Sequence, residues 1–150
     1  MRAPFQVLVL LYTWTVDGKP RYAVLRRADL GVWQPVAGGG EDEETPAQAA
    51  GREAWEEAGL PLGTELISLG VVGRVPVTEF RDRAHWPPHL ETIPEHAFAA
   101  PISPAALRLS AEHDAIEWMD YASAAARLHW PSNRAALAAL HQRLTSSPPA

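Results

Sequence analysis

Three glutamates with helical spacing are the residues in this chain best suited to chemistry. Glu53, Glu56 and Glu57 stand at positions i, i+3 and i+4, so on a helix their carboxylates share one face. Like charges at this spacing repel one another, and within the same stretch only Arg52 opposes them. A divalent cation would remove the repulsion, and carboxylates are hard oxygen ligands that suit Mg²⁺ or Mn²⁺. Taken alone, the pattern also fits an acidic helix face in solvent.

The residues around these glutamates predict the helix that would position them. Thr45 is a good N-cap, Pro46 suits the first helical position, and Gln48 completes a capping box with Thr45. Gly59, followed by Pro61, marks the end of the helix. Before the helix stand three successive glycines, 38–40, which we interpret as a loop with positive φ or a close approach of backbone to ligand.

The spacing of charged residues and glycines across residues 38–60 resembles the Nudix box. That signature reads G-x5-E-x7-R-E-U-x-E-E-x-G-U, where U is a bulky aliphatic residue, and every charged and glycine position matches. The chain departs from it at Ala54, which favours closer packing of the helix on a sheet, and at Glu43, where many members have a turn glycine. The matching residues are Gly38, Glu44, Arg52, Glu53, Glu56, Glu57 and Gly59.

The resemblance implies a Mg²⁺-dependent or Mn²⁺-dependent hydrolase of a nucleoside diphosphate linked to another group. Carried over by position, Glu53, Glu56 and Glu57 are expected as metal ligands, with the Gly38 carbonyl as a further oxygen. Arg52 would orient the glutamates by ion pairing. Glu44 would support the same cluster from the preceding loop.

Further stretches carry a second resemblance: Arg26-Arg27 through Trp33-Gln34, Glu112-His113 ahead of Glu117-Trp118, and Trp130-Pro131-Ser132-Asn133-Arg134. Together they resemble the dihydroneopterin triphosphate pyrophosphohydrolases, and the resemblance covers most of the chain. It implies cleavage of a nucleoside-triphosphate-like substrate to the monophosphate and pyrophosphate. Glu112 would be a further metal ligand or the general base, and His113 is the rival base. The expected substrate-binding residues are Arg26, Arg27, Trp33, Gln34 and Arg134.

Several alternatives stay open on the sequence. Arg26 and Arg27 end a strand and point to opposite sides, so one can reach a phosphate, whereas a solvated strand end is equally compatible. Standard or oxidised nucleoside triphosphates and nucleotide sugars remain candidate substrates. A catalytically silent Nudix domain that senses a ligand is a further alternative, although such domains usually lack one of the box carboxylates.

The composition and charge of the chain limit the kinds of partner and substrate that we expect. Residues 41–57 carry seven acids and one arginine, a charge of −6, whereas the whole chain carries −5. No basic stripe indicates nucleic acid, and no segment approaches the roughly 18 apolar residues of a membrane span. The absence of cysteine is typical of a reducing cytoplasm. We therefore expect a cytoplasmic enzyme acting on a small molecule.

The remaining pattern predicts one α+β domain over residues 1–144, a Nudix-type α/β/α sandwich with a mixed sheet between helices. Residues 145–150 are expected to be a disordered tail. The proline-rich connection 79–94 holds Trp86, which we expect to pack the loop onto the core rather than stack on a substrate base. Strands are expected over 5–15, 21–27, 33–36, 65–78, 96–102 and 116–119, and helices over 120–128 and 132–144.

Overall fold

The apolar run near the start of the chain forms the central strand of a mixed sheet. In the computed structural model, which describes residues 1–146, β1 (Arg2–Trp14) pairs in parallel with β6 (Thr92–Pro101). On its other edge β1 pairs antiparallel with β2 (Pro20–Arg27) and β4 (Val36–Glu41). The sheet is completed by β3 (Trp33–Gln34), β5 (Ile67–Pro76) and β7 (His113–Met119), in the order β3-β2-β1-β6-β5 with β7 on β2.

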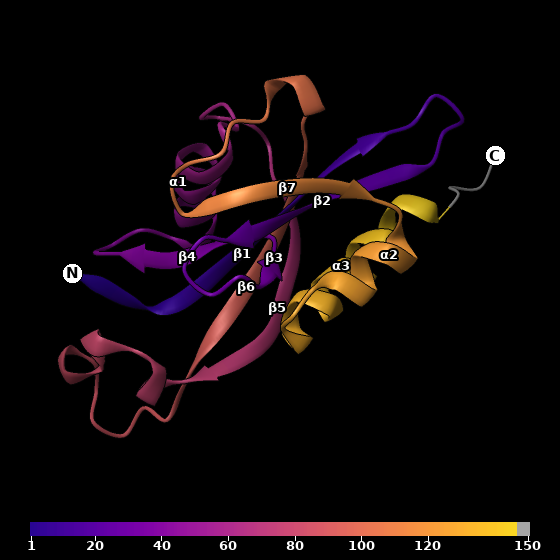
Figure 1. Cartoon of the computed structure of the whole chain (residues 1–150). Coiled ribbons are helices and arrows are strands. Elements are labelled where there is room, and N and C mark those ends of the chain that lie inside the picture. The colour runs from indigo at the N-terminus through magenta and orange to yellow at the C-terminus, as the bar shows by residue number, and fades with distance from the viewer. Residues whose placement is uncertain (147–150) are drawn as a thin grey trace.

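Alternation along β1 separates two apolar cores. Val7 and Val9 point to the side covered by helix α1 (Pro46–Ala58). Leu8 and Leu10 point to the side covered by α2 (Tyr121–Arg127) and α3 (Pro131–Thr145). Figure 1 shows these helices on the two faces of the sheet. The predicted α/β/α sandwich with a mixed sheet is confirmed.

Local sequence signals set both ends of α1. Thr45 Oγ1 accepts a hydrogen bond from the Gln48 amide at 3.2 Å, and Gln48 Oε1 accepts one from the Thr45 amide at 2.9 Å. Gly59 closes the helix in the left-handed conformation, at φ 75°. Ala54 is fully buried, so its small side chain lets the helix pack closely on the sheet, as predicted.

The structure corrects several expected boundaries. The glycine run is not a loop, because residues 38–40 lie in β4 and none of them has positive φ. Strands β6 and β7 each begin earlier than predicted, at Thr92 and His113. Helix α3 continues through Thr145, so the expected tail begins inside a helix, and residues 147–150 lie outside the described part of the chain.

The long connection between β5 and β6 folds against the first strand. It contains two 3₁₀ helices, η1 (Val77–Glu79) and η2 (Arg81–His85). Trp86 follows them, is 6% exposed, and donates a hydrogen bond from Nε1 to the Arg2 carbonyl at 2.9 Å. The predicted packing role of Trp86 is confirmed.

Candidate active site

Helix α1 carries its three glutamates from solvent into the protein interior. The Glu56 side chain is 47% exposed, Glu53 is 13% exposed, and Glu57 is 2% exposed. A purely solvated acidic face would leave all three in water. The burial of Glu57 therefore sets this helix apart from an ordinary charged surface, because a buried carboxylate is costly without a partner.

Arg52 ties the acidic residues together. Its Nε and Nη2 bind the two carboxylate oxygens of Glu44 at 2.8 and 3.0 Å, and Nη1 binds Glu53 Oε1 at 2.9 Å. Nη1 also lies 3.4 Å from Glu56 Oε2, while Nη2 donates to the Gly39 carbonyl at 2.9 Å. One guanidinium thus orients two glutamates of α1 and fastens the helix to β4, with Glu44 holding the guanidinium itself.

The glycine run makes room for this cluster. A Cβ added at Gly38 would lie 2.5 Å from Glu53 Oε1, closer than such contacts occur. Gly38 is therefore required for close approach of the β4 backbone to the Glu53 carboxylate, rather than for a left-handed turn. This places the Gly38 backbone and Glu53 side by side, as the box predicts.

Glu57 and His113 meet behind the cluster. His113 Nδ1 lies 3.7 Å from Glu57 Oε1, and both side chains are almost fully buried. Burial, reinforced by the neighbouring carboxylates of Glu53 and Glu112, raises the pKa of Glu57 to about 10. Burial, followed by the charge of Arg27, lowers the pKa of His113 and so favours the neutral ring. His113 is positioned to contact Glu57, not the solvent.

Glu112 reaches the same group of carboxylates from outside the box. Its backbone carbonyl accepts a hydrogen bond from the Ala28 amide at 2.9 Å, which fixes the turn before β7. The carboxylate opens onto the cleft, and partial burial followed by the charge of Glu53 raises its pKa, against the opposing charge of Arg27. Glu112, unlike His113, faces the space where a substrate would lie.

The carboxylate oxygens around Glu57 suit a hard divalent cation. Both carboxylate oxygens of Glu57 are buried without a hydrogen-bond partner, among other carboxylates. Within residues 1–146 no three acidic or histidine side chains already converge as a compact metal cluster. Arg52 instead contacts Glu53 and Glu56, at 2.9 and 3.4 Å. The oxygen-only donor set suits Mg²⁺ or Mn²⁺.

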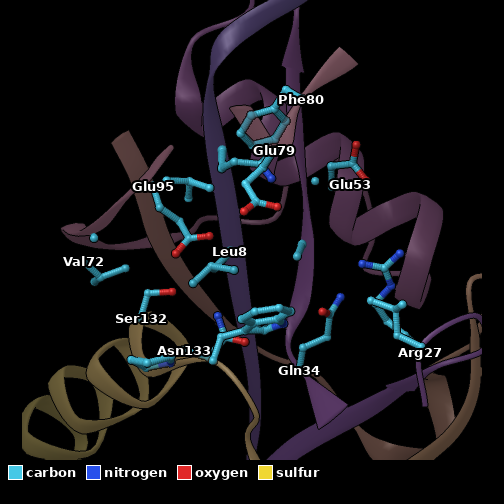
Figure 2. A pocket seen from close by; sticks show the side chains of 18 of the residues that line it. Leu8, Arg27, Gln34, Glu53, Val72, Glu79, Phe80, Glu95, Ser132 and Asn133 are labelled. Carbon is cyan, nitrogen blue, oxygen red and sulfur yellow. The ribbon is translucent and has the colours of Figure 1, made fainter. Parts of the chain in front are cut away.

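A cleft of about 1300 Å³ opens beside the cluster. Figure 2 shows Arg27 and Glu53 on one side of it, and Glu95 and Ser132 on the other. Five of the predicted site residues line this cleft, namely Arg27, Gln34, Gly38, Glu53 and Glu112.

Three predicted substrate-binding residues lie outside the cleft lining. Arg26 pairs with Asp114 at 2.7 Å, so of the two adjacent arginines Arg27 is the one that faces the site. The ring of Trp33 lies beneath the guanidinium of Arg127, 4.9 Å from it. Arg134 donates to the carbonyls of Leu128 and His129 and so holds the start of α3.

The structure also brings forward cleft residues that the sequence did not single out. These include Arg2, whose guanidinium lies over Gly39 and 4.8 Å from the ring centre of Phe80. They also include Glu95, which lies on the same face of β6 as the buried Ile93 and Ala97. This two-residue spacing was the available signal, since it places a carboxylate on a buried face.

No helix among the described residues has the length and apolar character needed to cross a membrane.

Comparison with known proteins agrees with this geometry. Residues 6–140 match the NUDIX domain family. A NUDIX hydrolase structure from Listeria monocytogenes superimposes with a TM-score of 0.80 at 36% identity, covering 95% of this chain and 94% of that one. The Escherichia coli dihydroneopterin triphosphate pyrophosphohydrolase gives a TM-score of 0.72 at 29% identity, covering 91% and 93%.

Two curated relatives differ in how much of them is matched. The E. coli K12 dihydroneopterin triphosphate diphosphatase is 31% identical over 140 residues, 91% of each protein. A Myxococcus xanthus octanoyltransferase is 40% identical over 113 residues, 70% of this chain, but the chain spans only 28% of that protein. With the box, the sandwich and the family match in agreement, the chain belongs to the NUDIX domain family and is a Nudix hydrolase, of the class acting on phosphoric anhydride bonds.

Proposed function

We propose that this protein is a Mg²⁺-dependent pyrophosphohydrolase that converts a nucleoside-triphosphate-like substrate to its monophosphate and pyrophosphate. Dihydroneopterin triphosphate is the substrate we favour. The observation that carries the proposal is the Arg52-bound glutamate cluster at one side of a cleft of about 1300 Å³. The relative named for dihydroneopterin triphosphate, matched over 91% of both chains, supports the choice of substrate.

Each residue of the cluster has a role in this proposal. Glu53, Glu56, Glu57, Glu112 and the Gly38 carbonyl would hold the metal. A Mg²⁺ ion held there would supply positive charge for the pyrophosphate oxygens and lower the pKa of a water molecule bound to it. Arg52 keeps the α1 carboxylates oriented, and Glu44 keeps Arg52 in place.

Two residues on the cleft wall would act directly on the reactants. Glu112, exposed at the cleft, takes the proton of the attacking water. Arg27 binds a phosphate oxygen of the substrate. The role of Arg27 is separable from metal binding by mutation, whereas Glu112 is also a proposed metal ligand.

Other members of the same reaction class are the competing functions. Standard or oxidised nucleoside triphosphates and nucleotide sugars would use the same cluster with a different group in the cleft. A ligand-sensing domain without activity is disfavoured because every box carboxylate is present. The cysteine-free composition supports action in the cytoplasm.

The test is a pyrophosphate-release assay with and without Mg²⁺. The panel holds dihydroneopterin triphosphate, the standard nucleoside triphosphates, 8-oxo-dGTP and two nucleotide sugars, ranked by kcat/KM. We expect pyrophosphate and the monophosphate from the best substrate, at equal amounts. Release of orthophosphate instead, or no turnover of any compound, would overturn the proposal.

A further inference from the structure

The cleft contains a second polar group that the phosphate chemistry does not use. Glu95 is 7% exposed and Asn133 is 2% exposed, and both line the cleft. Glu95 Oε1 and Asn133 Oδ1 are buried without any hydrogen-bond partner. Two buried acceptors without donors are uncommon in folded proteins, because each loses its hydration and gains nothing in return. A ligand that brings donors would remove this deficit.

The fold builds this place from three elements. Glu95 of β6 lies opposite Gly73 of β5. A Cβ at Gly73 would come within 3.1 Å of Ser132 Cβ and 3.9 Å of Glu95 Oε1, so the glycine allows α3 and the carboxylate to approach. Asn133 follows Ser132 in the first turn of α3. Its backbone N–H donates to the Trp130 carbonyl at 3.1 Å.

Apolar groups complete the setting for a flat ring. Leu8 and Val72 line the cleft beside Glu95 and Ser132, as Figure 2 shows. Trp130 also lines the cleft and is 43% exposed. Its ring offers a large face for stacking. Pockets for planar ligands typically combine such apolar walls with a few fixed polar groups.

The unpaired atoms select the chemistry of the ring edge. Guanine and pterin rings share a 2-amino-4-oxopyrimidine edge, on which a ring N–H and an amino group stand side by side as donors. A carboxylate accepts both at once. On adenine and cytosine the amino group stands next to a ring nitrogen that accepts, and that nitrogen would face the carboxylate unfavourably.

We propose that Glu95, assisted by Asn133, forms a subsite that recognises the 2-amino-4-oxopyrimidine edge of a pterin or guanine ring. The subsite rests on the proposed function, since it holds the ring while the phosphates extend toward α1. Figure 2 places Glu95 across the cleft from Glu53 and Arg27, which leaves the two groups to opposite ends of one substrate. Burial raises the pKa of Glu95, and the Ser132 side chain lowers it to a smaller extent. Hydrogen-bond donors from a ligand would act in the same direction as Ser132 and favour the charged carboxylate.

Metal-free binding tests the subsite separately from hydrolysis. Neopterin, guanosine and adenosine, which carry no phosphate, are titrated into wild type by calorimetry in chelator. We expect neopterin or guanosine to bind at least about tenfold more tightly than adenosine, and the stronger of the two identifies the natural ring. Equal binding of adenosine overturns the subsite, whatever the enzyme hydrolyses.

A matched pair of variants locates the effect. Glu95→Gln keeps the shape of the side chain and removes one acceptor, so binding of the preferred ring should fall about 30-fold or more, and kcat/KM for its triphosphate likewise. Activity on ATP should change less than about threefold, which also shows that the variant is folded. Glu91→Gln makes the same chemical change at an exposed glutamate outside the cleft lining and should have no effect.

The outcomes separate the two proposals. If the wild type hydrolyses no triphosphate but still prefers neopterin or guanosine, the proposed function fails and the subsite stands. If hydrolysis is normal but Glu95→Gln weakens all rings equally, or none, the subsite fails and the hydrolase stands.

Discussion

The two ends of the cleft differ in how far the protein itself pairs their polar groups. At the α1 end Arg52 contacts Glu44, Glu53 and Glu56 within 3.4 Å, and Glu57 is the one carboxylate of the helix face left without a hydrogen-bond partner. At the other end no arginine plays this part, and Glu95 Oε1 and Asn133 Oδ1 are buried acceptors without a hydrogen-bond partner. The first end is organised around a cation that the protein itself carries. The second remains incomplete until something with donors arrives.

This difference separates the general chemistry from the specific recognition. Pyrophosphate is common to all substrates of the reaction class, and most of its proposed site lies in one continuous stretch, residues 38–57, which Arg27 and Glu112 complete. The ring differs from substrate to substrate, and its proposed site is assembled from β5, β6 and α3. Similarity to the family is therefore stronger support for the proposed pyrophosphate site than for the proposed ring site.

Removing the divalent metal should produce the largest effect. The carboxylates of α1 and Glu112 repel one another and any polyanion, so without a cation the substrate cannot be held productively. We expect kcat to fall by more than about 10³-fold in excess chelator and to return with Mg²⁺ or Mn²⁺, with Zn²⁺ restoring it poorly. Phosphate-free ring binding should be unchanged in the same buffer. Full turnover in chelator would contradict the metal assignment.

Glu56→Gln should have the next largest effect. It preserves the size and helix propensity of the residue while removing one negative charge from the proposed ligand set. We expect kcat to fall by a factor on the order of 10²–10⁴ with little change in the melting temperature. Glu44→Gln should cost less, because the proposed role of Glu44 is to hold Arg52 in place and not to bind the metal.

The control for this loss is Glu43→Gln. Glu43 is an exposed acid in the turn just before α1, so the variant lowers the local charge equally without touching the cluster. Wild-type kcat is expected for it. A comparable loss in both variants would show that net charge near the helix matters, and not the position of Glu56.

Features of the two ends could be predicted from the sequence where the residues that determine them are close together in the chain. The caps of α1 were predicted because Thr45, Gln48 and Gly59 act on neighbours within a few residues. The glycine run was misassigned to a loop, since each glycine makes room for a side chain distant in sequence: Gly38 for Glu53, Gly39 for Arg2 and Gly40 for Phe5. Glu95 was missed as a site residue because the two-residue spacing along β6 shows only that it is buried, while the cleft around it is formed by β5 and α3.

Glu112→Gln should lower kcat by about a hundredfold while leaving the Kd of the substrate within a few-fold. Glu112 faces the cleft, whereas its neighbour His113 is buried against Glu57. His113→Ala should therefore lower kcat less and lower the melting temperature, because it opens a cavity beside Glu57. Single-turnover rates and thermal unfolding of both variants decide between the two bases. A larger kcat loss in His113→Ala, at unchanged stability, would move the base to the histidine.

The smallest predicted effect concerns the two adjacent arginines at the end of β2. Both pair with an aspartate, Arg27 with Asp29 and Arg26 with Asp114, and both are similarly exposed, 36% and 42%. Only Arg27 lines the cleft. Arg27→Gln should raise KM about tenfold with kcat nearly unchanged, since a charged hydrogen bond to phosphate contributes about 1.5–3 kcal/mol and Asp29 competes for part of it.

Arg26→Gln is the matched control, because it removes the same charge one residue away on the other side of the strand. We expect its KM to stay within about twofold of wild type. Raising the salt concentration should shrink the Arg27→Gln effect, because screening weakens the contact in the wild type. Equal KM changes in the two variants would mean that the arginines act through overall charge. The phosphate contact would then have to be sought at Arg2, which lines the cleft and whose guanidinium lies near Gly39 of β4.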